Sequence, residues 1–180
     1  MEASWHTPAG DLTIIVNRGR IVYCNWDEED CRRKYVKICR ECNENYDTVS
    51  ESDLMFKTNE MVMEAAKSGL QEYFEGKRRE FSLPLGLIGT SFQIKVWETL
   101  ASIKYGEKVS YKEIAEKCGC SGGVRAVASA CGQNPIAIMI PCHRVVSSNG
   151  KLGGYTGGVE KKEYLLALET PETTESTPKT

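Results

Sequence analysis

The sequence has only two histidines, His6 and His143, so a metal site at its eight cysteines would have to be formed by thiolates alone. The cysteines with motif-like spacing do not supply a regular ligand set; they are Cys24, Cys31, Cys39 and Cys42, and separately Cys118 and Cys120. We therefore predict that the protein binds no metal and no cofactor. An all-thiolate site at the first group is the alternative.

Long apolar runs are also missing. No stretch approaches the roughly 18 apolar residues that span a bilayer, and residues 1–5 have neither a basic flank nor an apolar signal core. We expect no membrane contact and a protein that stays where it is made, in the cytoplasm, or in the nucleus if the source is a eukaryote. Reduced cysteines fit that setting better than a disulfide scaffold.

An excess of positive charge is absent from the chain as a whole, whose formal net charge is −2. The charge is unevenly divided, however. Residues 1–85 contain 12 Lys and Arg against 16 Asp and Glu, whereas residues 86–170 contain 10 against 7. A polyanionic partner is therefore expected to bind the second part.

The first part has the pattern of a small α/β domain over residues 1–85. Two β-rich runs, 12–16 and 21–24, flank a glycine-containing turn and predict a hairpin. Residues 58–74 have apolar residues at helical spacing (Val62, Ala65, Ala66, Gly69, Leu70 and Tyr73), with Gly76 placed to end the helix. A short helix is possible within residues 27–51. Residues 81–89 contain Pro84 and two glycines and predict the connector to the second domain.

The second part, residues 86–169, has the pattern of a helical domain. A helix is predicted over 91–103, and Ser110-x-x-Glu113 is a capping box that opens another. After the glycine-rich turn 119–123, Val124, Val127, Ala128 and Cys131 predict a further helix with these residues facing the core. Two helices joined in this way indicate a helix-turn-helix. Residues 170–180 have no apolar residue to bury and are predicted to be disordered.

Two features could carry chemistry. The outward face predicted for the helix after residue 123 places Arg125 among small residues, namely Gly122, Ala126, Ser129, Ala130, Gly132 and Gln133. Such a face suits close approach to a DNA minor groove, although packing against another helix would use small residues equally well. Cys142 next to His143 suggests a nucleophile and its base. Adjacent residues of an extended strand point to opposite faces, so their contact requires a bent backbone or a bridging water; a buried structural cysteine is the alternative.

Pro141-Cys142-His143-Arg144-Val145 resembles the active-site motif of the O6-alkylguanine-DNA alkyltransferases. Further segments stand in that family's order and spacing from residue 72 to residue 169, and the similarity is loose before that. They are Glu72-Tyr73-Phe74, Gly89-Thr90-x-Phe92-Gln93-x-x-Val96-Trp97, Val109-Ser110-Tyr111, Arg125-Ala126-Val127, Asn134-Pro135, Gly153-Gly154-Tyr155-Thr156-Gly157-Gly158 and Leu165-Leu166-x-x-Glu169.

The resemblance implies an α+β protein, with an N-terminal ribonuclease-H-like α/β domain and a C-terminal helical domain carrying a winged-helix-like helix-turn-helix. It also implies residue roles. Cys142 would accept the alkyl group, His143 would act as base through a water, and Glu169 would orient the imidazole. Asn134 would hold the active-site segment and Tyr111 would donate a proton to the base. Other residues would bind the substrate: Arg125 in the gap left by a flipped nucleotide, Tyr155 and Thr156 as pocket walls, the carbonyls of Cys142 and Val145 at the guanine edge, and Ala126 and Ser129 on the DNA-facing helix.

The implied function is DNA repair by stoichiometric, irreversible transfer of an alkyl group from O6 of guanine, and from O4 of thymine, to Cys142 after nucleotide flipping. Double-stranded DNA would be bound from its minor groove by a monomer. The pattern departs from the family at Ala128-Ser129, where a glycine pair is common. The alternative function is a non-catalytic helix-turn-helix sensor of alkylated DNA.

Overall fold

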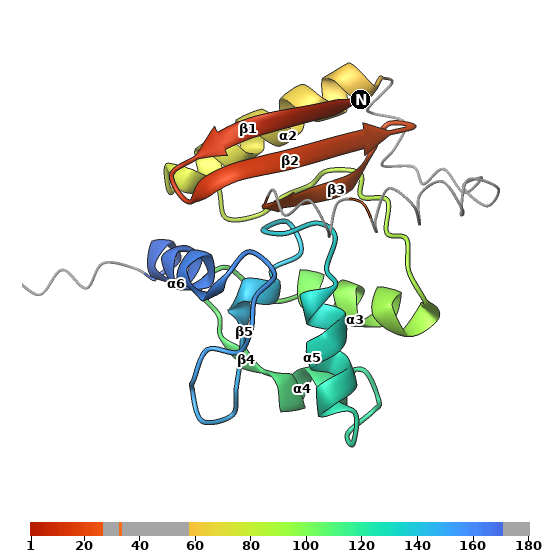
Figure 1. The fold of residues 1–180 in the computed structure, drawn as a ribbon, viewed down its shortest axis with the longest axis vertical. Coiled ribbons are helices and arrows are strands. Elements are labelled where there is room, and N and C mark those ends of the chain that lie inside the picture. The colour runs from red at the N-terminus through yellow and green to blue at the C-terminus, as the bar shows by residue number, and fades with distance from the viewer. Residues whose placement is uncertain (27–32, 34–57, 171–180) are drawn as a thin grey trace, which may run out of the picture.

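The computed structural model describes residues 1–26, 33 and 58–170. Figure 1 shows a small sheet with a helix along one face, and a group of helices on the side of the sheet away from that helix. In chain order the elements are β1 (Glu2–Thr7), β2 (Gly10–Asn17), β3 (Arg20–Trp26), α2 (Asn59–Phe74), α3 (Ser91–Ala101), β4 (Val109–Ser110), α4 (Tyr111–Lys117), α5 (Val124–Gly132), the 3-10 helix η2 (Cys142–Arg144), β5 (Val145–Val146) and α6 (Val159–Leu168). None of the helices in these ranges has the length and apolar character needed to cross a membrane.

The sheet is antiparallel in the order β1-β2-β3. The predicted hairpin is confirmed, and its turn places Arg18 and Gly19 at positive φ, 50° and 71°, as a two-residue hairpin turn requires. Strand β1 was not predicted. It is an edge strand whose residues are mostly exposed or half-buried, so its sequence lacks the strong apolar alternation of β2.

Helix α2 covers one face of the sheet (Figure 1). The Thr58 side chain accepts a hydrogen bond from the Met61 amide at its start, and Gly76 follows its end with φ 72°. Both predicted ends are therefore confirmed. The predicted core face is correct except that Met63 is buried and Ala65 is only half-buried. The predicted helix within residues 27–51 and the tail 171–180 lie outside the described residues.

The helical part begins with two capped helices. Thr90 and Gln93 form a reciprocal cap at the start of α3, and Ser110 and Glu113 form the predicted one at the start of α4. Helix α3 ends two residues earlier than predicted. Helices α3, α4 and α5 pack on one another, and the α4–α5 pair with its short turn confirms the predicted helix-turn-helix arrangement.

Helix α5 corrects one prediction. Its buried residues are Val127, Ala130 and Cys131, whereas Ala128, predicted to face the core, is exposed. Val127 and Cys131 are buried as predicted and Val124 packs half-buried against the core, but Ala130 takes the place expected for Ala128 and so lies on the inner face instead of the outer one. The indole of Trp97 explains the choice, because its Nε1–H donates to the Ala130 carbonyl at 2.9 Å. Alanine fits either face, so its own side chain could not decide the rotation of the helix.

The apolar run 136–140 is buried, and it is not an extended strand. Ile136 forms a parallel bridge with Cys24 of β3, Ile138 has φ 71°, and the chain then enters η2 at Cys142. The backbone is therefore bent where Cys142 and His143 meet. After η2, Val145 pairs with Val109 in the short parallel sheet β4-β5.

Candidate active site

Cys142 begins η2 and is 6% exposed. The Asn134 side-chain amide donates to Cys142 Sγ at 3.1 Å and to the Ile140 carbonyl at 2.8 Å, while its Oδ1 accepts from the Ile136 amide at 3.0 Å. Asn134 therefore holds both the Cys142 thiol and the bent backbone of residues 136–140 that leads to it. Burial raises the pKa of the Cys142 thiol, although the Asn134 hydrogen bond opposes this. The resting thiol consequently needs a base before it can act as a nucleophile.

His143 is fully buried beside it, and its Nε2 lies 2.9 Å from Glu169 Oε1. Burial lowers the pKa of the imidazole despite the neighbouring carboxylate. A neutral ring that donates from Nε2 to Glu169 has its lone pair on Nδ1. That Nδ1 is buried and has no hydrogen-bond partner among the described residues, so it is available to accept a proton.

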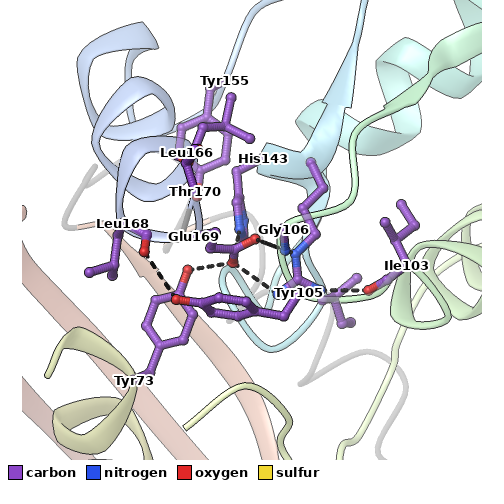
Figure 2. Close-up of polar contacts among 12 residues, drawn as sticks. Tyr73, Ile103, Tyr105, Gly106, His143, Tyr155, Leu166, Leu168, Glu169 and Thr170 are labelled. Atoms are coloured by element: carbon purple, nitrogen blue, oxygen red, sulfur yellow. Dashed lines mark hydrogen bonds and ion pairs between the residues drawn. The ribbon is translucent and has the colours of Figure 1, made fainter. Parts of the chain in front are cut away.

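Glu169 is 2% exposed and accepts five hydrogen bonds, most of which Figure 2 shows as dashed lines. The donors are His143 Nε2 (2.9 Å), the Tyr73 hydroxyl (2.7 Å), Arg144 Nη2 (2.9 Å) and Nε (2.8 Å), and the Gly106 amide (3.1 Å). Burial alone would raise the pKa of this carboxyl, but the hydrogen bonds from His143 and Arg144, with the charge of Arg144, outweigh it and hold the pKa well below its ordinary value. Glu169 is therefore a fixed carboxylate that sets the ring orientation of His143.

Tyr73, Arg144 and Lys162 are site residues to which the sequence analysis gave no role. Lys162 is fully buried on α6, and its Nζ donates to the Val145 carbonyl at 2.6 Å and lies 5.8 Å from the centre of the Tyr111 ring. Burial lowers its pKa, while Cys142 and Cys131 oppose the shift. A signal was present, since Lys162 and Glu169 share with Leu165 and Leu166 the apolar stripe of α6 at helical spacing.

Tyr111 stands at the start of α4 and faces the glycine-rich segment 153–158. A Cβ added at Gly153 would lie 2.5 Å from the Tyr111 hydroxyl oxygen, so only glycine permits this approach. Burial, followed by the nearby Cys131 and Cys142 thiols, raises the pKa of Tyr111 to about 12. Tyr111 is thus a neutral phenol near the thiol, in the protonation state that a proton donor needs.

The residues predicted to line the substrate pocket form hydrogen bonds with other residues of the protein. The Tyr155 hydroxyl accepts from Trp26 Nε1 at 3.2 Å, and Thr156 Oγ1 donates to the Gly132 carbonyl at 2.5 Å. The Val145 carbonyl accepts from Lys162, and the Cys142 carbonyl accepts from the Val145 amide. A carbonyl oxygen has two lone pairs, so both carbonyls retain one acceptor site.

Three predicted substrate-binding residues, Arg125, Ala126 and Ser129, are exposed on α5, away from the core face of that helix. They form a surface in which Arg125 is the long cation among small side chains. Within residues 1–26, 33 and 58–170 no three His, Cys, Asp or Glu side chains are grouped to hold a metal ion. Of the cysteines considered for a thiolate site, Cys31, Cys39 and Cys42 lie outside those ranges.

Comparison with known proteins gives matches over both parts of the chain. The family model for the 6-O-methylguanine DNA methyltransferase DNA binding domain matches residues 91–171, and that for the ribonuclease-like domain of the same enzymes matches residues 1–87. A methylated-DNA–protein-cysteine methyltransferase from Mycolicibacterium paratuberculosis is 50% identical over 111 residues, which are 62% of this chain and 67% of the relative. One from Methanosarcina barkeri is 50% identical over 62% of this chain and 70% of its own.

Solved structures match over nearly the whole length. The crystal structure of Mycobacterium tuberculosis OGT in complex with DNA aligns with 95% of each chain, at a TM-score of 0.74 and 35% identity. The architecture is that of an α+β protein with an N-terminal sheet domain and a C-terminal helical domain, as predicted. Two family models that together span residues 1–87 and 91–171, and relatives that share half of their aligned residues, give one result: the chain belongs to the 6-O-methylguanine DNA methyltransferase family.

Proposed function

We propose that this protein repairs DNA by direct reversal, transferring the alkyl group from O6 of guanine, and from O4 of thymine, to Cys142. The observation that carries the proposal is the buried series Cys142, His143 and Glu169, in which the imidazole is held by the carboxylate and its Nδ1 is free to accept a proton. Family membership supports the same reaction.

The first step is activation of the thiol. His143 Nδ1 accepts the Cys142 proton through a bridging water, and Glu169 stabilises the imidazolium that forms. Glu169 is thus a positioning residue that acts through His143. The high pKa that burial gives Cys142 makes the thiolate a strong nucleophile once it is generated. Asn134 and Lys162 stabilise the negative charge that then develops on Sγ.

In the transfer step Sγ forms a bond to the alkyl carbon while the bond between that carbon and O6 breaks. The electron pair of the broken bond stays with the base, which takes up a proton at a ring nitrogen; Tyr111 is the donor, because it is neutral and close to the thiol. The products are an unmodified guanine and a thioether. A thioether is a poor leaving group, so each molecule reacts once.

Access to O6 requires that the nucleotide leave the base stack, which costs a few kcal/mol and is cheapest for a badly paired lesion. The α5 face suits a minor-groove approach by a monomer, since Ala126 and Ser129 allow close contact and Arg125 can fill the space of the extruded base. In this proposal the carbonyls of Cys142 and Val145 read the guanine edge, and Tyr155 and Thr156 form walls of the pocket.

The deciding experiment is incubation with a duplex oligonucleotide containing O6-methylguanine, followed by peptide mapping. The peptide with Cys142 should gain the mass of one methyl group, with one equivalent of protein consumed for each lesion. Cys142→Ala should bind the same duplex with little change in affinity and remove no methyl group. The alternative, a sensor without chemistry, predicts binding with no gain of mass, and methyl removal by Cys142→Ala would disprove the proposed acceptor.

A further inference from the structure

The end of strand β3 reaches the active site directly. The Cys24 amide donates to the Pro135 carbonyl at 2.9 Å, and the Ala137 amide donates to the Cys24 carbonyl at 2.6 Å. The next residue, Asn25, donates from Nδ2 to the Asn134 carbonyl at 3.0 Å. The sheet thus continues onto the segment that leads to Cys142.

Trp26, the last residue of β3, extends this contact to the other wall of the site. It is 2% exposed, and its Nε1–H donates to the Tyr155 hydroxyl at 3.2 Å. The indole lies so close to Gly157 that an added Cβ there would be 2.0 Å from its Cδ1. Lys161 contacts both residues, because its Nζ lies 5.6 Å from the centre of the Trp26 ring and donates to the Gly157 carbonyl at 2.9 Å.

Besides Trp26 and Lys161, the Thr156 hydroxyl holds the segment 151–158, because it donates to the Gly132 carbonyl at 2.5 Å. Residues 151–158 contain four glycines and form no helix or strand, so their backbone conformation is entropically costly to fix. Tyr155 packs against the core within electrostatic range of Cys142, and burial raises the pKa of its hydroxyl well above the ordinary value. A shift of this segment would therefore change the room beside the thiol.

We propose that Trp26 is a positioning residue that determines substrate specificity: by holding Tyr155 and Gly157 against the sheet, it sets the size of alkyl group that Cys142 can accept. This rests on the proposed function, in which Tyr155 walls the base pocket. The N-terminal sheet is then part of the specificity apparatus and not only a scaffold.

The geometry gives a direction for the effect. Removal of the indole N–H frees the Tyr155 hydroxyl and loosens the 155–157 segment, so the pocket widens. A methyl substituent is then held less firmly in line with Sγ, while a benzyl substituent gains space. A hydrogen bond contributes about 0.5–1.5 kcal/mol, so the benzyl-to-methyl ratio of rates should rise about 2- to 10-fold.

The experiment compares single-turnover rates on two duplexes of one sequence, carrying O6-methylguanine or O6-benzylguanine, with excess protein. Trp26→Phe should raise the benzyl-to-methyl ratio by that factor and leave the affinity for undamaged duplex unchanged. The matched control is Trp5→Phe in β1, whose indole lies tilted against Phe74 with the ring centroids 6.2 Å apart. The benzyl-to-methyl ratio of rates of Trp5→Phe should equal that of the unmodified protein.

A double-mutant cycle tests whether Trp26 acts through its hydrogen bond to the Tyr155 hydroxyl. Tyr155→Phe removes the hydroxyl that accepts from Trp26, so the double variant should show no further change in the ratio beyond Trp26→Phe. Lys161→Met keeps most of the length of the side chain but loses the hydrogen bond to the Gly157 carbonyl, so it should shift the ratio in the same direction. It is the second test of the inference if Trp26→Phe fails to fold.

An unchanged ratio in folded Trp26→Phe or Lys161→Met, or an equal shift in Trp5→Phe, would overturn this inference. Failure of the proposed function gives a different result, because the unmodified protein would then gain no alkyl mass at Cys142 from either duplex.

Discussion

Burial acts in opposite directions on the two residues at the centre of the site. It raises the pKa of the Cys142 thiol and lowers that of the His143 imidazole, so both are neutral at rest. The pair is therefore prepared for a proton transfer that occurs only when substrate is present, and the resting thiol is protected from adventitious electrophiles by its low content of thiolate.

The rate of transfer should depend on pH through His143. Below its depressed pKa the imidazole is protonated and cannot accept from Cys142, so the single-turnover rate should hold near neutral pH and fall only as the pH drops below about 6.5, the ordinary imidazole value. It should increase on the alkaline side only above about pH 9, because burial raises the thiol pKa above its ordinary value and thiolate forms there without the base. Rates on a methylated duplex, with circular dichroism to confirm folding at each pH, provide the check. A rate that increases toward acid would contradict the assignment of His143 as base.

Glu169 should make the fold sensitive to acid. Its folded pKa is depressed, so its stabilising effect is fully present above the unfolded carboxyl value of about 4.3 and is lost as the pH falls toward the folded value. Glu169→Gln leaves Arg144 buried without its ion-pair partner and should cost about 3–5 kcal/mol of unfolding free energy at neutral pH. Urea unfolding at about pH 7 and pH 3 measures both effects.

The matched control is Glu163→Gln, which removes an exposed carboxylate from the same helix. It should leave the unfolding free energy within about 0.5 kcal/mol and keep the acid sensitivity. If Glu169→Gln retained the same loss of stability between the two pH values, the depressed pKa of Glu169 would not be the cause.

The resemblance indicated the residues of the motif and the pairing of Glu169 with His143, but not the other partners of Glu169. Cys142, His143, Asn134 and Glu169 lie together as the resemblance implied. Tyr73 has no comparable signal: it was assigned to the core face of α2, and nothing in that stripe shows that its hydroxyl donates to Glu169, 96 positions away. A polar contact between distant segments depends on the register of both, which a periodic pattern does not give.

At the scale of elements, α5 shows which information a helical pattern contains. The existence of the helix and its start follow from the glycine-rich turn 119–123 and the apolar spacing, but the positions of Ala128 and Ala130 relative to the core were predicted incorrectly. The hydrogen bond from the Trp97 indole on α3 to the Ala130 carbonyl favours the orientation in which Ala130, and not Ala128, faces the core. Capped helices such as α4 were predictable because Ser110 and Glu113 satisfy the helix end locally.

The exposed face of α5 gives a test of nucleotide flipping. Arg125→Ala removes the side chain proposed to occupy the gap in the duplex, so the rate on duplex O6-methylguanine should fall by at least 10-fold, about 1.4 kcal/mol. Reaction with free O6-benzylguanine needs no such gap and should change less than 2-fold. Lys151→Ala, an exposed cation outside α5, is the control. Equal losses on both substrates would remove Arg125 from this role.

At the scale of the whole molecule, the reaction should weaken the fold. Cys142 is buried with the Asn134 amide 3.1 Å from its sulfur, so an added methyl group must displace neighbours in a closely packed site. Overpacking costs about 1–3 kcal/mol, which lowers the melting temperature by several degrees for a protein of this size. The benzyl adduct should be less stable than the methyl adduct.

Thermal melts of the free, methylated and benzylated protein provide the measurement, together with protease digestion at constant temperature. Protein incubated with unmodified duplex and then freed of DNA is the control for handling. An unchanged or raised melting temperature after alkylation would show that the pocket accepts the adduct without strain.

The bond between Asn25 and Asn134 joins positions 109 residues apart, and its consequence concerns the time course of folding. Closing a loop of that length is entropically costly and typically follows the formation of local helices and hairpins. The bend at Cys142 is supported by this long-range contact, so reactivity arises only when the sheet and the helices have joined. A newly made or partly unfolded molecule has the cysteine but not the oriented imidazole. Cys142 therefore becomes reactive only in the folded molecule, in which the substrate-binding residues are also in position.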